Sequence, residues 1–388
     1  RDTGEAGRRM DGYKSEGKGR EVVGAMLRPI IGRHHRGWIG AVVNVAAVVA
    51  TAIGVATTLG FGTIQVGAGI ERIFGLHAGV PLQLTIIAVA FVLYMASTLS
   101  GVDKGIKWLS NFNLALAALL LALVLVLGPT GAIFNTFTTT LGSYLNQLVT
   151  MSLRMSPFSS STWVADWTIF YWAWWISWAP FVGSFIARIS RGRSVREFVV
   201  GVVLAPTLLG FFWFSVFGGT AIWSQIFGHA DLVQALGNGY ETVLFTLFDS
   251  MPLPLLLSCI ALVLLMIFFV TSADSAVLVL ASMSTDEAGD PPLKRKLAWG
   301  VGIALIAGAL LLAGGLDALQ GMITIAALPF ALLMVLVMVS LYRVLDEEYT
   351  RERRQALRQR HMIDAWIARE MAAQEETQAE AARAQDQG

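Results

Sequence analysis

The chain has 388 residues, of which 55% are hydrophobic and 14% charged, and its formal net charge is +1. An average soluble domain has about 25% charged residues, so this composition excludes a soluble globular protein. A net charge near zero gives no reason to expect a nucleic-acid partner, and none is predicted. The single cysteine, Cys259, lies within an apolar run and cannot form an internal disulfide.

Apolar runs of about 20 residues, enough for a helix to cross about 30 Å of hydrocarbon, recur along the chain. They predict an all-α integral membrane protein with eight spanning helices. The predicted spans are 38–61, 79–100, 108–128, 167–187, 198–219, 253–282, 297–315 and 319–342. The predicted organisation is a basic cytoplasmic segment (1–36), a transmembrane domain (37–342) and a cytoplasmic helical tail (343–388).

The basic residues predict the orientation. If residues 1–36 are cytoplasmic and all eight runs span, 26 of the 28 Lys and Arg residues face the cytoplasm, and only Arg72 and Arg154 lie outside. This bias is typical of multi-pass proteins of the cell (plasma) inner membrane, and it places both ends of the chain in the cytoplasm. Segment 129–166 is too polar to span, and we expect an amphipathic helix there along the external surface.

The span 167–187 contains a tryptophan-rich stretch, WTIFYWAWWISWAPF. At 100° per residue, six aromatic side chains between Trp167 and Phe185 form a stripe about 80° wide, with Trp175 about 40° beyond the edge. The stripe consists of Trp167, Tyr171, Trp174, Trp178, Phe181 and Phe185. Such rings form an interfacial belt, pack against other helices, or cage an organic cation.

A cage has a physical basis. A quaternary ammonium group has no N–H to donate, and aromatic faces attract it by about 2 kcal/mol or more per desolvated contact. The stretch from Trp167 to Ile189 has no Asp or Glu, so its rings would have to bind such a cation. Pro180 kinks this helix, which fits either a cavity or a packing contact.

A second polar stretch is FFVTSADS in the span 253–282. The adjacent hydroxyls of Thr271 and Ser272 could join backbone carbonyls around a sodium ion, or bond to their own helix four residues back. Asp274 is an acid within a span and hence a functional candidate, or it pairs with a nearby donor. Earlier in the chain, no charge occurs from Trp38 to Ile70. That leaves a dissociable ion rather than a fixed Lys or Arg to supply positive charge there.

The tryptophan-rich helix running into PFVGSFIARISRGRSVREF resembles the signature of the betaine/carnitine/choline transporter family. ATAIGVATTLGFGTIQVGAGI, FGGTAIW and FFVTSADS resemble that family too, and the resemblance covers about residues 27–342. It implies ion-coupled uptake of a small quaternary ammonium substrate by alternating access. It also implies a fold of two inverted five-helix repeats in contact with membrane lipid, and a homotrimer.

The resemblance also assigns substrate-contacting residues. Trp174, Trp175 and Trp178 belong to the substrate pathway and aromatic cage, with Phe181 lining the site. No enzymatic activity and no cofactor other than a coupling ion, most simply sodium, is implied.

The same resemblance assigns ion ligands. Thr271 and Ser272, with the carbonyl of Phe268, match one sodium site. Thr51 is similar to a hydroxyl position of a second sodium site, but Val55 stands where a sodium-coupled relative has another hydroxyl.

Members of that family have twelve spans, and this chain begins where their fifth would begin. We therefore expect a fragment of a longer transporter that does not catalyse coupled uptake by itself. The substrate remains open among glycine betaine, choline and carnitine. The alternatives are a membrane osmolyte sensor that does not transport, a proton-coupled choline transporter and a substrate exchanger.

Overall fold

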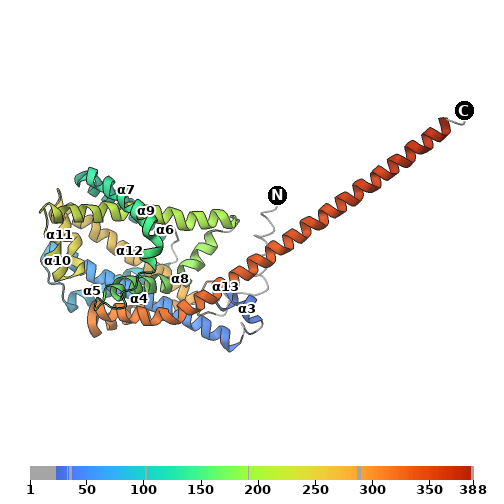
Figure 1. Ribbon diagram of the computed structural model, residues 1–388. Helices are drawn as coiled ribbons and strands as arrows, with labels where there is room; N and C mark the ends of the chain where they lie inside the picture. Colours follow the sequence, from blue (N-terminus) through green and yellow to red (C-terminus); the bar gives the residue numbers. More distant parts are fainter. Residues whose placement is uncertain are drawn as a thin grey trace. The chain divides into compact units, whose positions relative to one another are not determined.

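The structure is a computed structural model that describes residues 23–32, 34, 37–100, 103–190, 192–285 and 290–385. Over these residues the regular secondary structure is helical, which confirms the predicted all-α class (Figure 1). The elements are α2 (Val23–Met26), α3 (Arg28–Ile31), α4 (Trp38–Phe74), α5 (Val80–Ser100), α6 (Asp103–Leu127), α7 (Thr130–Ser152), η2 (Val164–Ile169), α8 (Phe170–Ile189), α9 (Val195–Ile226), α10 (Leu232–Asn238), η3 (Tyr240–Thr242), α11 (Val243–Asp249), α12 (Pro254–Met283) and α13 (Leu293–Gln385). The described residues divide into two compact units, one formed by Val23 with the described part of 42–331 and the other by the described part of 24–41 with 332–385.

Six helices of the described chain are long and apolar enough to cross a membrane, compared with eight predicted spans. They are Trp38–Phe74, Val80–Leu99, Trp108–Leu127, Val195–Ile226, Pro254–Met283 and Leu293–Met371. The predicted span 167–187 falls on α8, which is not among the six. Its four tryptophans and one tyrosine lower its mean hydropathy below that of an aliphatic span.

The last two predicted spans both lie in α13, and α13 breaks between them. Gly314 and Gly315 leave helical geometry, and the φ of Gly315 is +57°, a backbone region that favours glycine. The break therefore divides α13 at the point where the sequence predicts a boundary between spans 297–315 and 319–342.

Within segment 129–166, residues 130–152 form α7, and α7 packs along α9. Aromatic pairs contribute to this contact. The ring centroids of Tyr144 and Phe211 lie 4.8 Å apart, and those of Phe137 and Phe212 lie 5.9 Å apart. Ile133 is completely buried at the start of α7.

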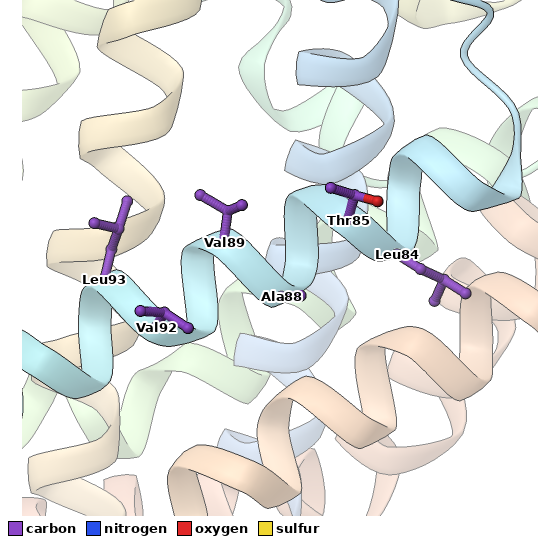
Figure 2. A pocket seen from close by; sticks show the side chains of 6 residues that line it. All are labelled: Leu84, Thr85, Ala88, Val89, Val92 and Leu93. Atoms are coloured by element: carbon purple, nitrogen blue, oxygen red, sulfur yellow. The ribbon is translucent and has the colours of Figure 1, made fainter.

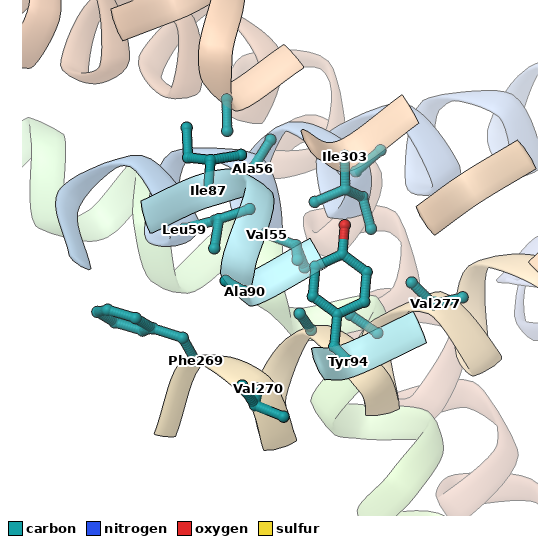
Figure 3. Close-up of a cluster of buried hydrophobic side chains, with 14 of the residues drawn as sticks. Val55, Ala56, Leu59, Ile87, Ala90, Tyr94, Phe269, Val270, Val277 and Ile303 are labelled. Atoms are coloured by element: carbon teal, nitrogen blue, oxygen red, sulfur yellow. The ribbon is translucent and has the colours of Figure 1, made fainter. Parts of the chain in front are cut away.

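The main core of residues 42–331 combines side chains from α4, α5, α12 and the first part of α13 (Figure 3). Tyr94 of α5 is fully buried, and its hydroxyl donates to the carbonyl of Gly300 at 2.6 Å. A side chain at Gly62 of α4 would overlap the ring of Phe269 of α12. Glycine thus allows α12 to approach α4 closely, as small residues do between membrane helices.

In the second unit, the hydroxyl of Ser340 donates to the carbonyl of Met26. Leu27, the next residue along, is 1% exposed. The helical tail of this unit, the part of α13 after residue 332, continues to Gln385.

Candidate functional site

The aromatic helix α8 lies against α4 at a glycine. A Cβ atom at Gly54 would overlap the side chain of Ser177 and would lie 3.2 Å from Cδ1 of Trp178. Ser177 is completely buried, and its hydroxyl donates to the carbonyl of Trp174 at 2.7 Å. Within α8, the carbonyl of Pro180 accepts a hydrogen bond from the Ser184 hydroxyl at 2.8 Å. The absence of a side chain at Gly54 therefore sets how closely α8 approaches α4.

Trp174 contacts α4 through both its indole N–H and its ring. The N–H donates to the hydroxyl of Thr58 at 2.9 Å, and that hydroxyl donates to the carbonyl of Gly54 at 2.9 Å. The ring centroid lies 5.4 Å from that of Phe61 of α4 and 5.7 Å from that of Phe170 of α8. The position of this ring is consequently well determined by its neighbours.

Trp178 and Phe181 lie one turn further along α8. Their rings meet edge to face with centroids 5.5 Å apart, and Phe181 is buried. The indole N–H of Trp178 is also buried, and it has no hydrogen-bond partner among the described residues. Since more than about 90% of buried polar groups are hydrogen-bonded, this donor is a candidate for contact with a ligand or an ordered water molecule.

The hydroxyl of Thr51 is a second such group. Thr51 is completely buried, and its hydroxyl likewise finds no partner in the described chain. Thr51 precedes Gly54 by three residues and so lies on nearly the same side of α4. A buried donor on α8 and a buried hydroxyl on α4 thus flank the contact at Gly54.

The structure places Trp175 differently from the other predicted cage residues. Its side chain is 76% exposed, whereas Trp174 and Trp178 are half-buried. Trp175 lies about 40° beyond the edge of the aromatic stripe, whereas Trp174 and Trp178, within the stripe, lie against α4. The described chain therefore pairs Trp178 with Phe181, packs Trp174 against Phe61 and Phe170 instead, and leaves Trp175 on an exposed face.

The predicted ion ligands on α12 lie on one continuous helix. The hydroxyl of Thr271 donates to the carbonyl of Ile267 at 2.9 Å and lies 3.2 Å from the carbonyl of Phe268. Ser272 is half-buried, and the Phe268 side chain is exposed. The structure thus places the Thr271 hydroxyl and the Phe268 carbonyl together, with the hydroxyl bonded to its own helix.

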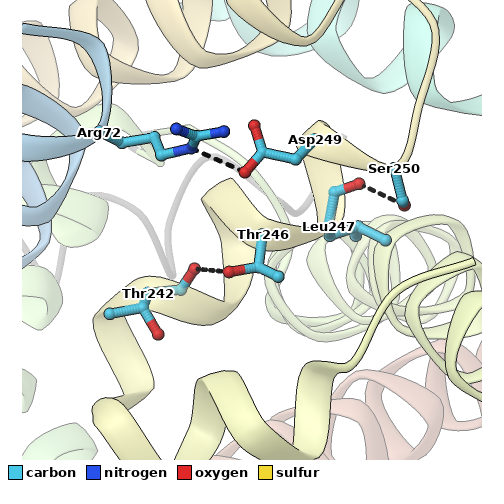
Figure 4. A network of polar contacts seen from close by, with 6 residues as sticks. All are labelled: Arg72, Thr242, Thr246, Leu247, Asp249 and Ser250. Atoms are coloured by element: carbon cyan, nitrogen blue, oxygen red, sulfur yellow. Dashed lines mark hydrogen bonds and ion pairs between the residues drawn. The ribbon is translucent and has the colours of Figure 1, made fainter.

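A set of polar and aromatic contacts connects α4 and η2 to η3 and α11. The Nε atom of Arg72 lies 2.7 Å from Oδ2 of Asp249 (Figure 4). The amide of Gln65 donates to the carbonyl of Glu241 at 3.1 Å. The ring of Trp167, in η2, meets that of Tyr240 edge to face at 5.5 Å.

An open groove of about 520 Å³ lies along α5. Figure 2 shows the side chains that line it, which are Leu84, Thr85, Ala88, Val89, Val92 and Leu93. None of them is charged or aromatic, and none belongs to the predicted site.

The structure adds residues that the sequence did not single out as part of the site. Thr58 and Phe61 fix the Trp174 ring, and Thr58 lies seven residues, or about two helical turns, after Thr51. That spacing predicts that Thr51 and Thr58 lie on the same face of α4. It does not identify α8 as the helix that the face meets.

A comparison with known protein families assigns the chain to a family. A model of the betaine/carnitine/choline family of transporters matches residues 13–350. The chain belongs to this family. It is therefore part of a multi-pass membrane transporter family and not of an enzyme family.

Three relatives give the extent of the match. The chain is 44% identical to the glycine betaine transporter OpuD of Bacillus subtilis over 329 residues, which are 84% of this chain and 64% of that protein. It is 40% identical to the ectoine/hydroxyectoine transporter of Virgibacillus pantothenticus, covering 85% of this chain and 66% of that protein. It is 39% identical to a glycine betaine/proline/choline transporter of Vibrio parahaemolyticus, covering 84% of this chain and 58% of that protein. The chain thus spans about three fifths of the length of these relatives.

Proposed function

We propose that this chain contributes the aromatic substrate-binding helix to an ion-coupled transporter of quaternary ammonium osmolytes, such as glycine betaine, choline or carnitine. The observation that supports this most directly is that Trp174, Trp178 and Phe181 lie on one face of α8 beside α4, in parts of the two helices (residues 38–70 and 170–187) that contain no charged residue. Ring faces can replace the hydration of a methylated ammonium group. The relatives named for glycine betaine and choline are consistent with this substrate class. Ectoine, for which another relative is named, is a zwitterion with a cyclic amidinium cation and not a quaternary ammonium compound.

Within this proposal, the substrate's cationic group contacts the faces of Trp174 and Trp178, and Phe181 closes one side. Trp175 lies on the substrate pathway. The indole N–H of Trp178 is a donor without a protein partner, so it is available to an acceptor atom of the substrate or to water.

The proposed coupling ion is sodium. Its ligands are the hydroxyls of Thr271 and Ser272 and the carbonyl of Phe268, and Thr51 belongs to a second sodium site. A thousandfold accumulation of a zwitterion costs about 4.1 kcal/mol. One sodium ion entering down about 100 mV and a roughly tenfold gradient supplies about 2.3 plus 1.4 kcal/mol, so two ions are sufficient and one is marginal.

The proposed arrangement is an eight-span segment with both ends in the cytoplasm, in a transporter that assembles as a homotrimer. Basic residues at the cytoplasmic ends then also contact anionic lipid. Accessibility of single cysteines introduced at positions 154 and 361 to a membrane-impermeant maleimide tests the orientation. We expect labelling from outside at position 154 and none at position 361.

Uptake by proteoliposomes tests the transport function. The assay uses the complete coding sequence that contains these 388 residues, with labelled glycine betaine, choline and carnitine, and sodium, potassium or proton gradients. We expect sodium-dependent accumulation of at least one substrate. Saturable binding without accumulation would favour the sensor, and accumulation driven by a proton gradient alone would favour proton coupling.

Two sets of variants test the sites. We expect Trp178→Leu and Trp175→Leu to raise the apparent KM for substrate about tenfold, the equivalent of about 1.4 kcal/mol, because each removes a ring. Trp172→Leu is the matched control, since Trp172 is exposed and off the stripe. Thr271→Ala should raise the sodium concentration for half-maximal uptake, whereas Ser282→Ala, which removes a similar hydroxyl further along α12, should not. An unchanged KM in Trp178→Leu and Trp175→Leu would contradict the assigned substrate site, and an unchanged sodium requirement in Thr271→Ala would contradict the assigned sodium site.

A further inference from the structure

Asp274 of α12 is a buried acid that the proposed substrate and sodium sites do not use. Its side chain is 4% exposed, and it faces α5, against which α12 packs. Oδ2 accepts a hydrogen bond from the Ser97 hydroxyl at 3.1 Å, and Oδ1 accepts one from the Thr98 hydroxyl. The carboxyl group is thus held by two hydroxyls of the neighbouring helix.

No basic side chain of the described residues lies within 4.0 Å of this carboxyl group. The charge of Lys296 acts on it from farther away, but the Lys296 ammonium group lies 2.9 Å from Oδ2 of Asp290. A buried carboxylate without a close cation is costly in a medium of low dielectric constant. A positive charge at the hydroxyls would remove this cost.

The hydroxyl groups around Asp274 also supply fewer protons than there are oxygen atoms able to accept a hydrogen bond. The hydroxyl oxygen of Thr98 lies within hydrogen-bond distance of Oδ1 of Asp274 and 2.8 Å from the carbonyl of Tyr94. A hydroxyl has one proton and can serve only one of these acceptors at a time. The carboxylate, the hydroxyls and the carbonyl therefore present more lone pairs than protons.

We propose that the Asp274 carboxylate, the Ser97 and Thr98 hydroxyls and the Tyr94 carbonyl bind a sodium ion between α5 and α12. Carboxylate, hydroxyl and carbonyl oxygens are the ligands that hard cations take. One carboxylate balances one positive charge, which matches a monovalent ion. The ion would share no ligand with the Thr271 and Ser272 hydroxyls, so this site does not depend on the proposed transport function.

Because an ion held by both helices binds the folded protein and not the unfolded chain, it should raise thermal stability. The test uses the 388-residue chain in lipid nanodiscs. Sodium chloride is titrated at constant ionic strength against N-methyl-D-glucamine chloride, and the Tm is read from tryptophan fluorescence. We expect a saturable rise in Tm with sodium in the unmodified chain.

Variants separate the two candidate ion sites. We expect Asp274→Asn to abolish the sodium-dependent shift, and Thr98→Val to raise its half-saturation concentration about tenfold or more. The Thr271→Ala/Ser272→Ala double variant should retain this shift. A sodium shift that persists in Asp274→Asn but disappears in the double variant would overturn the Asp274 site and support the proposed coupling site.

A second comparison applies if Asp274→Asn does not fold. Thr98→Ser keeps the hydroxyl and should keep the sodium response that Thr98→Val weakens. Equal responses in these two variants would overturn the proposal. A Tm of the unmodified chain that does not depend on sodium would also overturn the proposal. The Asp274 carboxyl group would then be stabilised by a bound proton or by the two hydroxyls alone, without an ion.

Discussion

The indole N–H of Trp174 donates to the hydroxyl of Thr58 at 2.9 Å, and that hydroxyl donates to the carbonyl of Gly54. The polar edge of this ring is therefore occupied by α4, and only the ring surface is left for a ligand. Trp178 differs, because its buried N–H has no partner among the described residues. Two tryptophans one turn apart can therefore make different contacts with a ligand: Trp174 through its ring surface alone, and Trp178 through its N–H as well.

Removing the bond between Trp174 and Thr58 should destabilise the packing of α8 on α4. We expect Trp174→Phe and Thr58→Val to be non-additive in a double-mutant cycle, with a coupling energy of about 0.5–1.5 kcal/mol, the usual net contribution of one hydrogen bond. Reversible denaturation in detergent micelles measures it. Thr138→Val is the matched control for Thr58→Val, since the Thr138 hydroxyl donates to its own helix on the exposed side of α7. Additive effects of the two variants would contradict the coupling.

A methyl group at Gly54 should separate α8 from α4. The added Cβ would overlap Ser177, so we expect Gly54→Ala to cost about 1–3 kcal/mol of stability, as overpacked sites do. Gly183→Ala is the control, because no atom lies within 4 Å of a Cβ at that helical position. A Gly54→Ala protein with an unchanged Tm would show that α8 shifts without cost.

The sequence predicts the helical elements and part of the site because both depend on local patterns. Apolar runs locate α4, α5, α6, α9 and α12, and the aromatic period places Trp174, Trp178 and Phe181 on one face. The same period puts Trp175 near that face, and the structure leaves it exposed. A helical period defines the face of a helix but not how far the neighbouring helix extends across it.

Partners distant in sequence could not be predicted. Thr58 and Trp174 are 116 residues apart, and Thr98 and Asp274 are 176 apart. Which hydroxyl meets which side chain depends on the relative axial positions of two helices. That register is set by close contacts such as Gly54 with Ser177 and Gly62 with Phe269, which no local pattern records.

The bond between Ser340 and the Met26 carbonyl should hold residues 24–31 in place. We expect Ser340→Ala to destabilise this segment by about 0.5–1.5 kcal/mol, because the Met26 carbonyl loses its hydrogen-bond donor. Hydrogen exchange followed by mass spectrometry should show faster exchange of the backbone amides of Leu27, Arg28, Ile30 and Ile31. Ser282→Ala, which removes a hydroxyl from α12, should leave their exchange unchanged, and equal exchange in both variants would count against the role of Ser340.

The ion pair of Arg72 and Asp249 connects the end of α4 to the end of α11 (Figure 4). The Arg72 side chain is 55% exposed and that of Asp249 is 33% exposed, so water and salt screen the pair. We expect Arg72→Met to cost about 0.2–1 kcal/mol at low ionic strength and less in 1 M salt, where the Debye length is about 3 Å. Tm measurements over a salt series should therefore converge for the variant and the unmodified chain. The exchanged pair Arg72→Asp/Asp249→Arg should recover part of the loss, whereas a deficit that does not depend on salt would assign the effect to packing of the arginine stem instead.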